Sequence, residues 1–227
     1  MSIYRELLRT DNKEVSTAGI VSEVRSEIEK LAGFIDYHHG TGKTSFLFTA
    51  TESGEGSTFV LAQTALLLAQ LNKNMKILVI DANLRTPDLH NHFNVSKERG
   101  LQDFLEETDD ALPVQQHSEN LGIITAGSKS EGQFARSGLS DLHRLLDKAS
   151  NEYDIIMIDS PAARWYADAV ALAPAVDGII LTIAAGVAGK GIIKTVIESL
   201  NDAGGEILGT VFNRRKDEIP SFIYRRL

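Results

Sequence analysis

Short apolar runs recur along the chain, and each has the length of one buried β-strand. They contain few polar positions, so they lack the alternation of a strand that faces water on one side. The pattern therefore predicts a mostly parallel sheet with helices over both faces. Five runs stand out and a sixth follows them: Ser45–Ala50, Met75–Asp81, Leu121–Thr125, Asp154–Asp159, Gly178–Ala184 and Ile207–Asn213.

Segments with apolar residues at helical spacing separate these runs. Alternation of strands and helices indicates parallel strands joined by crossover helices. A further amphipathic helix, Ser22–Ile35, is predicted before the first strand. The helices predicted between strands are Thr58–Leu71, Gln133–Ala149, Tyr166–Leu172 and Gly191–Asn201. The expected fold class is α/β, with a three-layer, doubly wound and mostly parallel sheet.

The composition of the chain argues against several classes of partner and structural feature. The chain has 227 residues, of which 43% are hydrophobic, enough for one large core. Its net charge of −8 argues against nucleic acid as a partner. Cysteine is absent, which excludes disulfides and suits a reducing compartment. No uncharged run reaches the roughly 20 residues of a membrane-spanning helix, and the first residues lack a signal-peptide core, so we expect a cytoplasmic protein.

The segment after the first strand has the composition of a phosphate-binding loop. Residues 51–58 read Thr-Glu-Ser-Gly-Glu-Gly-Ser-Thr and lead into a predicted helix. The two glycines permit a tight turn in which backbone N–H groups and a helix N-terminus face one anion. Ser57 stands where such loops carry lysine. The residues expected to bind nucleotide here are Gly54, Glu55, Gly56, Ser57 and Thr58.

Two aspartates end predicted strands. Asp81 closes the second strand, and Asp159 closes the fourth. The carboxyl ends of parallel strands meet at one edge of a sheet, so both carboxylates should lie near the hydroxyl of Thr58. Such oxygen atoms can hold Mg²⁺ directly or through water, which predicts a metal site of Thr58, Asp81 and Asp159. Either aspartate alone could equally serve as a helix cap or turn residue.

In their order along the chain, these motifs resemble the cytoplasmic kinase domain of bacterial tyrosine autokinases (BY-kinases). That family belongs with the ParA/MinD-type P-loop ATPases and acts in capsule and exopolysaccharide synthesis. Residues 50–58 resemble its Walker A loop, residues 77–87 its second acidic motif and residues 155–161 its Walker B motif. Further similarity lies in residues 100–105, 168–178 and 208–214.

The resemblance implies a P-loop NTPase-like domain over residues 45–213. An N-terminal helical segment, 1–44, would precede it, and a basic C-terminal tail, 214–227, would follow. The implied ligands are ATP or ADP with Mg²⁺. By the same resemblance, Asp81 and Asp159 would be the catalytic residues, with Asp159 holding the water shell of the metal. Asn213 would contact the adenine, with Arg214 beside it in the nucleotide site.

The sequence departs from the family pattern at positions that take part in nucleotide binding and phosphoryl transfer. Without the loop lysine at position 57, nucleotide binding should weaken by about 1.5–3 kcal/mol. Phosphoryl transfer should suffer more, because positive charge on the moving group supplies most of the catalysis. Asn83 replaces the family's second aspartate. The tail carries one tyrosine, Tyr224, as phosphoacceptor candidate, where the family has a cluster.

These features favour a BY-kinase-like ATP-binding protein that regulates capsule or exopolysaccharide polymerisation or export, with weakened or absent catalysis. Its expected partner is the cytoplasmic segment of a membrane-embedded, Wzz-like copolymerase, which would recruit it to the inner face of the cell membrane. Homo-oligomers are left open. The alternatives are an active tyrosine autokinase and a ParA/MinD-type positioning ATPase. The last usually has a lysine early in the loop, where residues 51–53 are Thr-Glu-Ser.

A second Gly-Lys-Thr sequence, at residues 42–44, fits a P-loop poorly. It leads into a strand, whereas a P-loop leads into a helix. We predict a turn between helix and strand here. A hypothesis motivated by Ser57 is that Lys43 of a neighbouring subunit supplies the missing charge.

Three groups of aromatic or basic residues each allow a functional interpretation and a purely structural one. His90 and His92 lie two residues apart, which is poor spacing for a helical metal pair, and we interpret them as solvated. Trp165 and Tyr166 either stack on a base or partner or, as we favour, pack over the sheet end. The basic tail either contacts an anionic surface or partner groove or is a solvated terminus.

Overall fold

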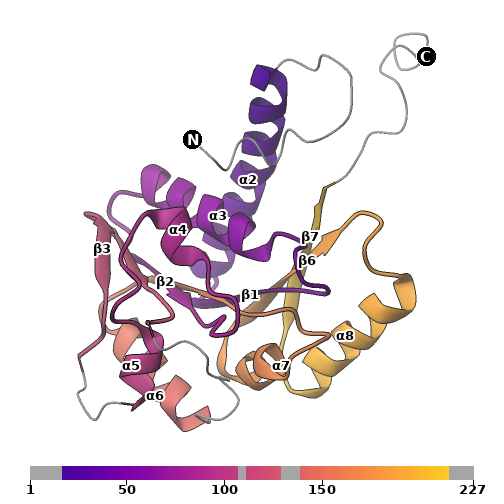
Figure 1. The fold of residues 1–227 in the computed structure, drawn as a ribbon. Helices are drawn as coiled ribbons and strands as arrows, with labels where there is room; N and C mark the ends of the chain where they lie inside the picture. Colours follow the sequence, from indigo (N-terminus) through magenta and orange to yellow (C-terminus); the bar gives the residue numbers. More distant parts are fainter. Residues whose placement is uncertain (1–16, 107–110, 129–138, 215–227) are drawn as a thin grey trace.

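The computed structural model describes residues 17–106, 111–128 and 139–214. Within these residues, one sheet of seven strands runs in the order β3-β4-β2-β5-β1-β6-β7 (Figure 1). Neighbouring strands are parallel, except for the antiparallel pair β3 and β4. The strands are β1 Ser45–Ala50, β2 Ile77–Asp81, β3 Gln115–Ser118, β4 Leu121–Ile124, β5 Ile155–Asp159, β6 Gly178–Ala184 and β7 Ile207–Asn213.

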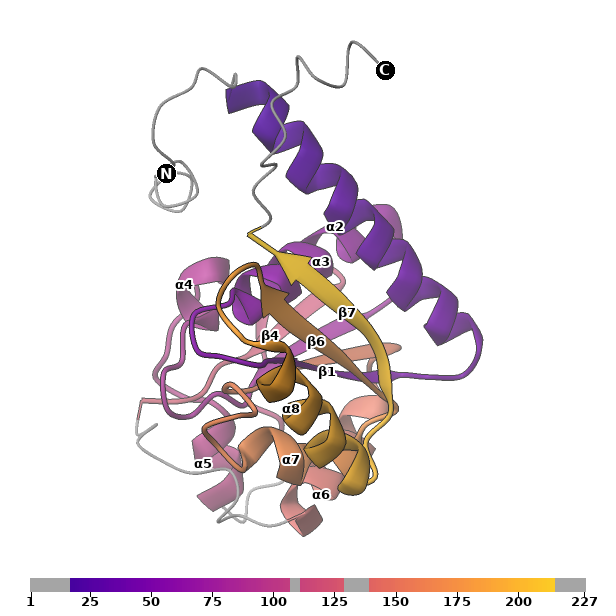
Figure 2. The same ribbon diagram turned by 90° about the vertical axis from the view of Figure 1, so that its right-hand side faces the viewer.

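Helices cover both faces of the sheet (Figures 1 and 2). One face carries α2 (Thr17–Gly40), α3 (Ser57–Leu71) and α4 (Leu89–Phe93). The opposite face carries α5 (Leu101–Glu106), α6 (Leu139–Ser150), α7 (Asp168–Leu172) and α8 (Lys190–Asp202), with a 3₁₀ turn at Ala173–Ala175. The predicted three-layer α/β fold is therefore confirmed.

The central strands alternate their side chains between two apolar cores. In β1, Phe46 and Phe48 face the core under α2 and α3, whereas Leu47 faces the core under α6 to α8. Strands β2 and β5 repeat this alternation. Because both faces of the sheet are buried here, every position of β2 and β5 before the final aspartate is apolar, and β1 departs only at Ser45 and Thr49. This burial explains the continuous apolar runs of the sequence.

The two edges of the sheet differ from the prediction. Strand β3, which the sequence pattern did not indicate, reads Gln-Gln-His-Ser and is largely exposed. Its polar residues suit an edge strand, and they leave no apolar signal. At the other edge, β7 is only partly buried, so its apolar run does not mark full burial. Phe34 of α2 packs over Gly209 in the middle of β7.

The helices differ mainly at their ends. Helix α2 is longer than predicted at both ends, and its first turns extend beyond the sheet (Figure 2). Its later turns bury Ala32 and Ile35 against α3. Helix α6 begins at Leu139, and the earlier part of its predicted range lies outside the described residues. Across the described segments, none of the helices combines the length and apolarity needed to span a membrane.

The histidine interpretation is wrong for His92. Its side chain, in α4, is only 10% exposed and lies 3.2 Å from the carboxylate of Asp88. Its ring also packs edge-on against Phe59 in the first turn of α3. Contacts with α3, which the spacing along the chain cannot indicate, remove this histidine from solvent.

Candidate functional site: a phosphate loop beside two buried carboxylates

The glycine-rich loop joins the carboxyl end of β1 to α3. Gly54 and Gly56 have φ angles of +80° and +95°, a conformation that residues with a side chain rarely adopt. Gly56 is the N-cap of α3 and makes no side-chain capping bond. Within the described residues, the N–H groups of residues 54–56 find no acceptor. The free N–H groups and the N-terminus of a 15-residue helix therefore meet at one point that favours an anion.

The side chain of Glu55 holds this loop in shape. Its buried carboxylate accepts hydrogen bonds from the N–H groups of Thr51 and Glu52, both at 2.9 Å. A third bond, of 3.1 Å, comes from the N–H of Ala184 at the end of β6. Glu55 thus points back into the protein. Any contact of this residue with a ligand would use its backbone N–H.

Asn213, at the end of β7, lies against the same loop. Its Nδ2 donates to the carbonyl of Glu55 at 2.8 Å, and its Oδ1 accepts from the N–H of Arg214 at 2.9 Å. Asn213 approaches so closely that a Cβ added to Gly56 would lie 2.5 Å from Nδ2. Arg214 follows in an exposed position with a φ of +55°. The loop and the end of β7 are thus neighbours.

Asp81 and Asp159 are direct neighbours in the register of β2 and β5, and both are fully buried. The hydroxyl of Thr58 donates to Oδ2 of Asp159 at 2.7 Å, and Oδ1 of Asp159 has no protein partner among the described residues. Asp81 accepts longer hydrogen bonds from the N–H groups of Asn83 and Leu89, at 3.2 and 3.3 Å. The three predicted metal ligands therefore come together.

Burial raises the pKa of Asp81 to about 7, although the N–H groups of Leu89 and Asn83 oppose this change. Burial likewise raises the pKa of Asp159 well above its ordinary value, and the negative charge of Asp81 raises it further. Two adjacent carboxylates in a dry site are costly when charged, and a cation between them would offset that cost.

These oxygen atoms fit Mg²⁺. The set consists of two carboxylates and a hydroxyl, with one carboxylate oxygen unpartnered. Over the described ranges, no group of three or more His, Cys, Asp or Glu side chains could hold a metal. Mg²⁺ commonly keeps several waters and takes only one or two carboxylates, so a small set suffices.

The two departures from the family pattern occupy different environments. Ser57, at the lysine position, is 6% exposed, and its hydroxyl has no partner among the described residues. Asn83 instead forms a turn, because its Oδ1 accepts from the N–H of Thr86 at 3.1 Å. Ser57 is therefore a polar group without a structural partner, whereas Asn83 has a structural one.

Lys43 lies at the amino end of β1, opposite the loop. Residues 41–44 form a turn between α2 and β1, which confirms the predicted turn. The ammonium of Lys43 donates to the carbonyl of Asp177 at 2.8 Å and to the carboxylate of Glu206 at 2.6 Å. A six-residue strand, roughly 20 Å long, separates it from the loop of its own chain. These contacts give no support to Lys43 as the replacement for the loop lysine.

The sequence interpretation missed two cationic clusters beside the site. Arg85 binds the buried carboxylate of Asp168 at 2.9 Å and lies over the ring of Tyr166, 4.2 Å from its centroid. Trp165 was expected to pack, yet it is 57% exposed and donates to the carboxylate of Glu52 at 2.6 Å. Arg164 binds the same carboxylate. No spacing along the chain brings Glu52 and Arg85 to the segment of residues 164–168, since they come from other loops.

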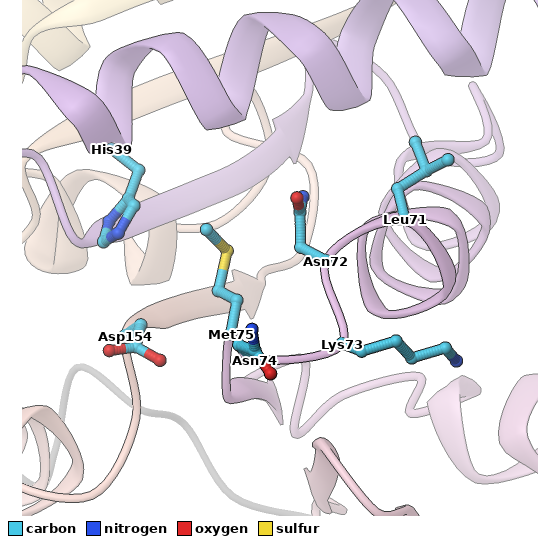
Figure 3. Close-up of a pocket in the computed structure, with 7 residues that line it drawn as sticks. All are labelled: His39, Leu71, Asn72, Lys73, Asn74, Met75 and Asp154. Atoms are coloured by element: carbon cyan, nitrogen blue, oxygen red, sulfur yellow. The ribbon is translucent and has the colours of Figure 1, made fainter.

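A cavity of about 420 Å³ opens at the amino end of the sheet, away from these groups (Figure 3). Its lining consists of His39, Leu71, Asn72, Lys73, Asn74, Met75 and Asp154. None of the predicted site residues reaches it. The carboxyl end of the sheet, where the loop and carboxylates converge, is therefore the candidate site.

A glycine-rich turn between a buried strand and a helix, beside two acidic strand ends, defines a P-loop nucleotide-binding domain of the α/β class. The sheet order supports this assignment, because β5 with Asp159 pairs directly with β1, which leads into the loop. Proteins of this class bind a nucleotide together with a metal ion.

Comparison with known proteins identifies a family within the P-loop class. No protein-family model matches the chain. CapB of Staphylococcus aureus, assigned as a tyrosine-protein kinase, is 30% identical over 183 residues, which are 79% of this chain and 79% of CapB. The tyrosine-protein kinase Etk of Escherichia coli K12 is 29% identical over 175 residues, which are 76% of this chain but only 24% of Etk. The chain belongs to the family of bacterial tyrosine kinases.

Solved structures agree with this assignment. The kinase domain of VpsO superposes with a TM-score of 0.76 at 27% identity, covering 87% of this chain and 97% of that domain. A ParA family ATPase from Chlorobium tepidum has a TM-score of 0.63 at 19% identity, covering 80% of this chain and 77% of that protein. The second similarity shows a shared fold alone.

Proposed function

We propose that this protein is a nucleotide-binding member of the family that regulates capsule or exopolysaccharide polymerisation or export with little or no phosphoryl transfer. The proposal depends on one observation: most groups of the site are present, but the residue at the lysine position is a serine. The loop, Thr58 and the two carboxylates lie together, which supports a magnesium-nucleotide site, while position 57 offers a hydroxyl in place of an ammonium. Binding should therefore persist in weakened form.

The remaining groups have separate roles in this proposal. Thr58, Asp81 and Asp159 would hold Mg²⁺, and the N–H groups of residues 54–58 would hold the phosphates. Asn213 and Arg214, beside the loop, would lie toward the base. Mg²⁺ supplies positive charge on the phosphates when bound. The lost lysine would have added more of that charge during transfer, which is why catalysis should suffer more than binding.

The cellular location and partner proposed for this protein are inferred from its family. A protein of this kind would act in the cytoplasm, recruited to the inner face of the membrane by the cytoplasmic segment of a Wzz-like copolymerase. Homo-oligomers would be compatible with such a role. Nucleic acid is not expected as a partner, because the net charge of the chain is −8.

Restoring the lysine tests the proposal. Ser57→Lys is expected to tighten magnesium-ATP binding about tenfold or more, equivalent to about 1.4 kcal/mol, because an ammonium would replace a hydroxyl beside the phosphates. Calorimetric titration with magnesium-ATP and magnesium-ADP measures the change. Wild type should bind with a dissociation constant weaker than tens of micromolar. A sub-micromolar wild-type constant, or no binding by either protein, would contradict the proposal.

An active autokinase is the second candidate, and the preserved pair of Asp81 and Asp159 favours it. Its phosphoacceptor would be Tyr224, which lies outside the described residues. We expect negligible phosphotyrosine after incubation of purified protein with magnesium-ATP, because the transferred group lacks the lysine charge. Mass spectrometry of wild type beside Tyr224→Phe measures this outcome. Phosphate that appears on Tyr224 and is absent from the variant would establish the kinase instead.

A further inference from the structure

The phosphate loop and the loop after β5 are joined by one carboxylate, that of Glu52. Its Oε2 accepts a hydrogen bond of 2.6 Å from Nε1 of Trp165, and its Oε1 binds the guanidinium of Arg164. The guanidinium also lies over the indole ring, with 4.5 Å between its central carbon and the ring centroid. Burial opposes the charged form of Glu52, but the hydrogen bonds from Arg164 and Trp165 outweigh it and lower the pKa of the carboxyl.

Backbone contacts hold Arg164 beside the phosphate loop. The N–H of Ala163 donates to the carbonyl of Ala50, the last residue of β1, at 2.9 Å. One residue further back along β1, the hydroxyl of Thr49 donates to the carbonyl of Pro161 at 3.0 Å. Arg164 therefore follows directly after a segment that is tied to the start of the phosphate loop. Its side chain is 36% exposed, so it has room to change partners.

Two other cations near the sheet, Arg85 and Lys43, are less able to move. Arg85 pairs with Asp168, whose side chain is only 2% exposed, so its guanidinium is held by a buried carboxylate. Lys43 is engaged at the opposite end of β1. Glu52, by contrast, would keep its bond to Trp165 if Arg164 left it. Arg164 is thus easier to transfer to a ligand than Arg85 or Lys43.

We propose that Arg164 leaves Glu52 for the terminal phosphate of the bound nucleotide and restores part of the binding that is missing with Ser57, while the loop position itself stays uncharged. This inference rests on the nucleotide site of the proposed function. A guanidinium binds phosphate through two parallel hydrogen bonds. Arg164 can therefore contact the terminal phosphate from a different side than the ammonium of a loop lysine would. Glu52 holds the side chain close to the loop until a triphosphate, with its greater negative charge, competes for it.

Calorimetry on the full chain tests the exchange. Arg164→Gln is expected to weaken magnesium-ATP binding about tenfold and magnesium-AMP binding much less, because the contact is with the terminal phosphate. Arg164→Lys should retain part of the affinity. Glu52→Gln should tighten magnesium-ATP binding severalfold, since it releases the guanidinium. The matched control is Arg25→Gln, which removes an exposed arginine paired with Glu29 on α2 and should change nothing.

Trp165 is the single tryptophan of the chain and gives an independent signal. Its fluorescence should change as magnesium-ATP is added to wild type and should change much less in Arg164→Gln. Urea unfolding verifies that each variant is folded. Equal magnesium-ATP affinity in wild type and Arg164→Gln would overturn the exchange and leave the proposed function intact. Absence of nucleotide binding by wild type would overturn both.

Discussion

The metal-free protein is expected to lose stability, on the order of 4 kcal/mol, as the pH rises from about 4 to about 8 and the buried carboxyl pair of Asp81 and Asp159 loses its protons. The carboxyl of Asp81 has an ordinary pKa of 3.8 and a pKa of about 7 in the folded protein. Each tenfold change in proton affinity corresponds to 1.36 kcal/mol. The effect is large because the carboxyl is fully buried, beside a second buried carboxyl.

The direction follows from proton linkage. Between the two pKa values, the folded state of Asp81 binds more protons than the unfolded state, so the free energy of unfolding falls as the pH rises. The stabilising contribution is fully present below about pH 3.8 and is lost as the pH rises through about 7. Asp159, whose pKa is also raised, changes stability in the same direction.

Urea unfolding in the presence of a chelator, repeated across this pH range, measures the effect. Asp81→Asn is the comparison, because it removes the titrating group, and its stability should vary less with pH. Magnesium-ATP should stabilise wild type more at pH 8 than at pH 5, since charged carboxylates bind the metal better. Equal pH dependence in wild type and variant would show that Asp81 does not titrate in this interval.

Gly56→Ala is expected to reduce magnesium-ATP affinity at least tenfold and to lower the free energy of unfolding by about 2–4 kcal/mol. Gly56 has a φ of +95°, where a side chain costs about 1–3 kcal/mol. The new methyl group would also lie 2.5 Å from Nδ2 of Asn213. Asn213 must then move and lose its 2.8 Å hydrogen bond to Glu55, which is worth about 0.5–1.5 kcal/mol.

Gly54→Ala separates backbone strain from collision. Gly54 has a φ of +80°, but no atom lies within 4 Å of an added Cβ. It should therefore lose only the strain contribution to stability and should retain more affinity than Gly56→Ala. Calorimetry and urea unfolding of both variants measure the difference. If both variants bind nucleotide equally, the contact with Asn213 is unimportant to the loop.

Much of the fold could be predicted because burial leaves a direct record in the sequence. Strands β1, β2 and β5 are buried on both faces and are therefore mostly apolar, and each prediction was accurate to within two residues. Strand β3 could not be predicted in this way. Its four residues are polar and join the sheet through hydrogen bonds to β4, which depend on backbone geometry.

The candidate site likewise contains residues whose proximity the sequence predicts and residues whose proximity it does not. The glycines, Thr58 and the strand-end aspartates are adjacent to strands that the pattern identifies, so parallel topology alone predicts that they meet. Glu52 and Arg164 come from loops more than a hundred positions apart. Their contact depends on how the loop after β5 runs beside β1, and no periodicity records it.

By itself, the sequence determined the layered α/β architecture, the position of the phosphate loop and the absence of its lysine. These features depend on local composition and on the alternation of strands and helices. Only the tertiary structure decided that Arg164 and Trp165 meet Glu52 of that loop, that Lys43 is held by Asp177 and Glu206, and that His92 packs against Phe59 of α3. Charge and burial act through space, and chain folding alone sets the distances over which they act.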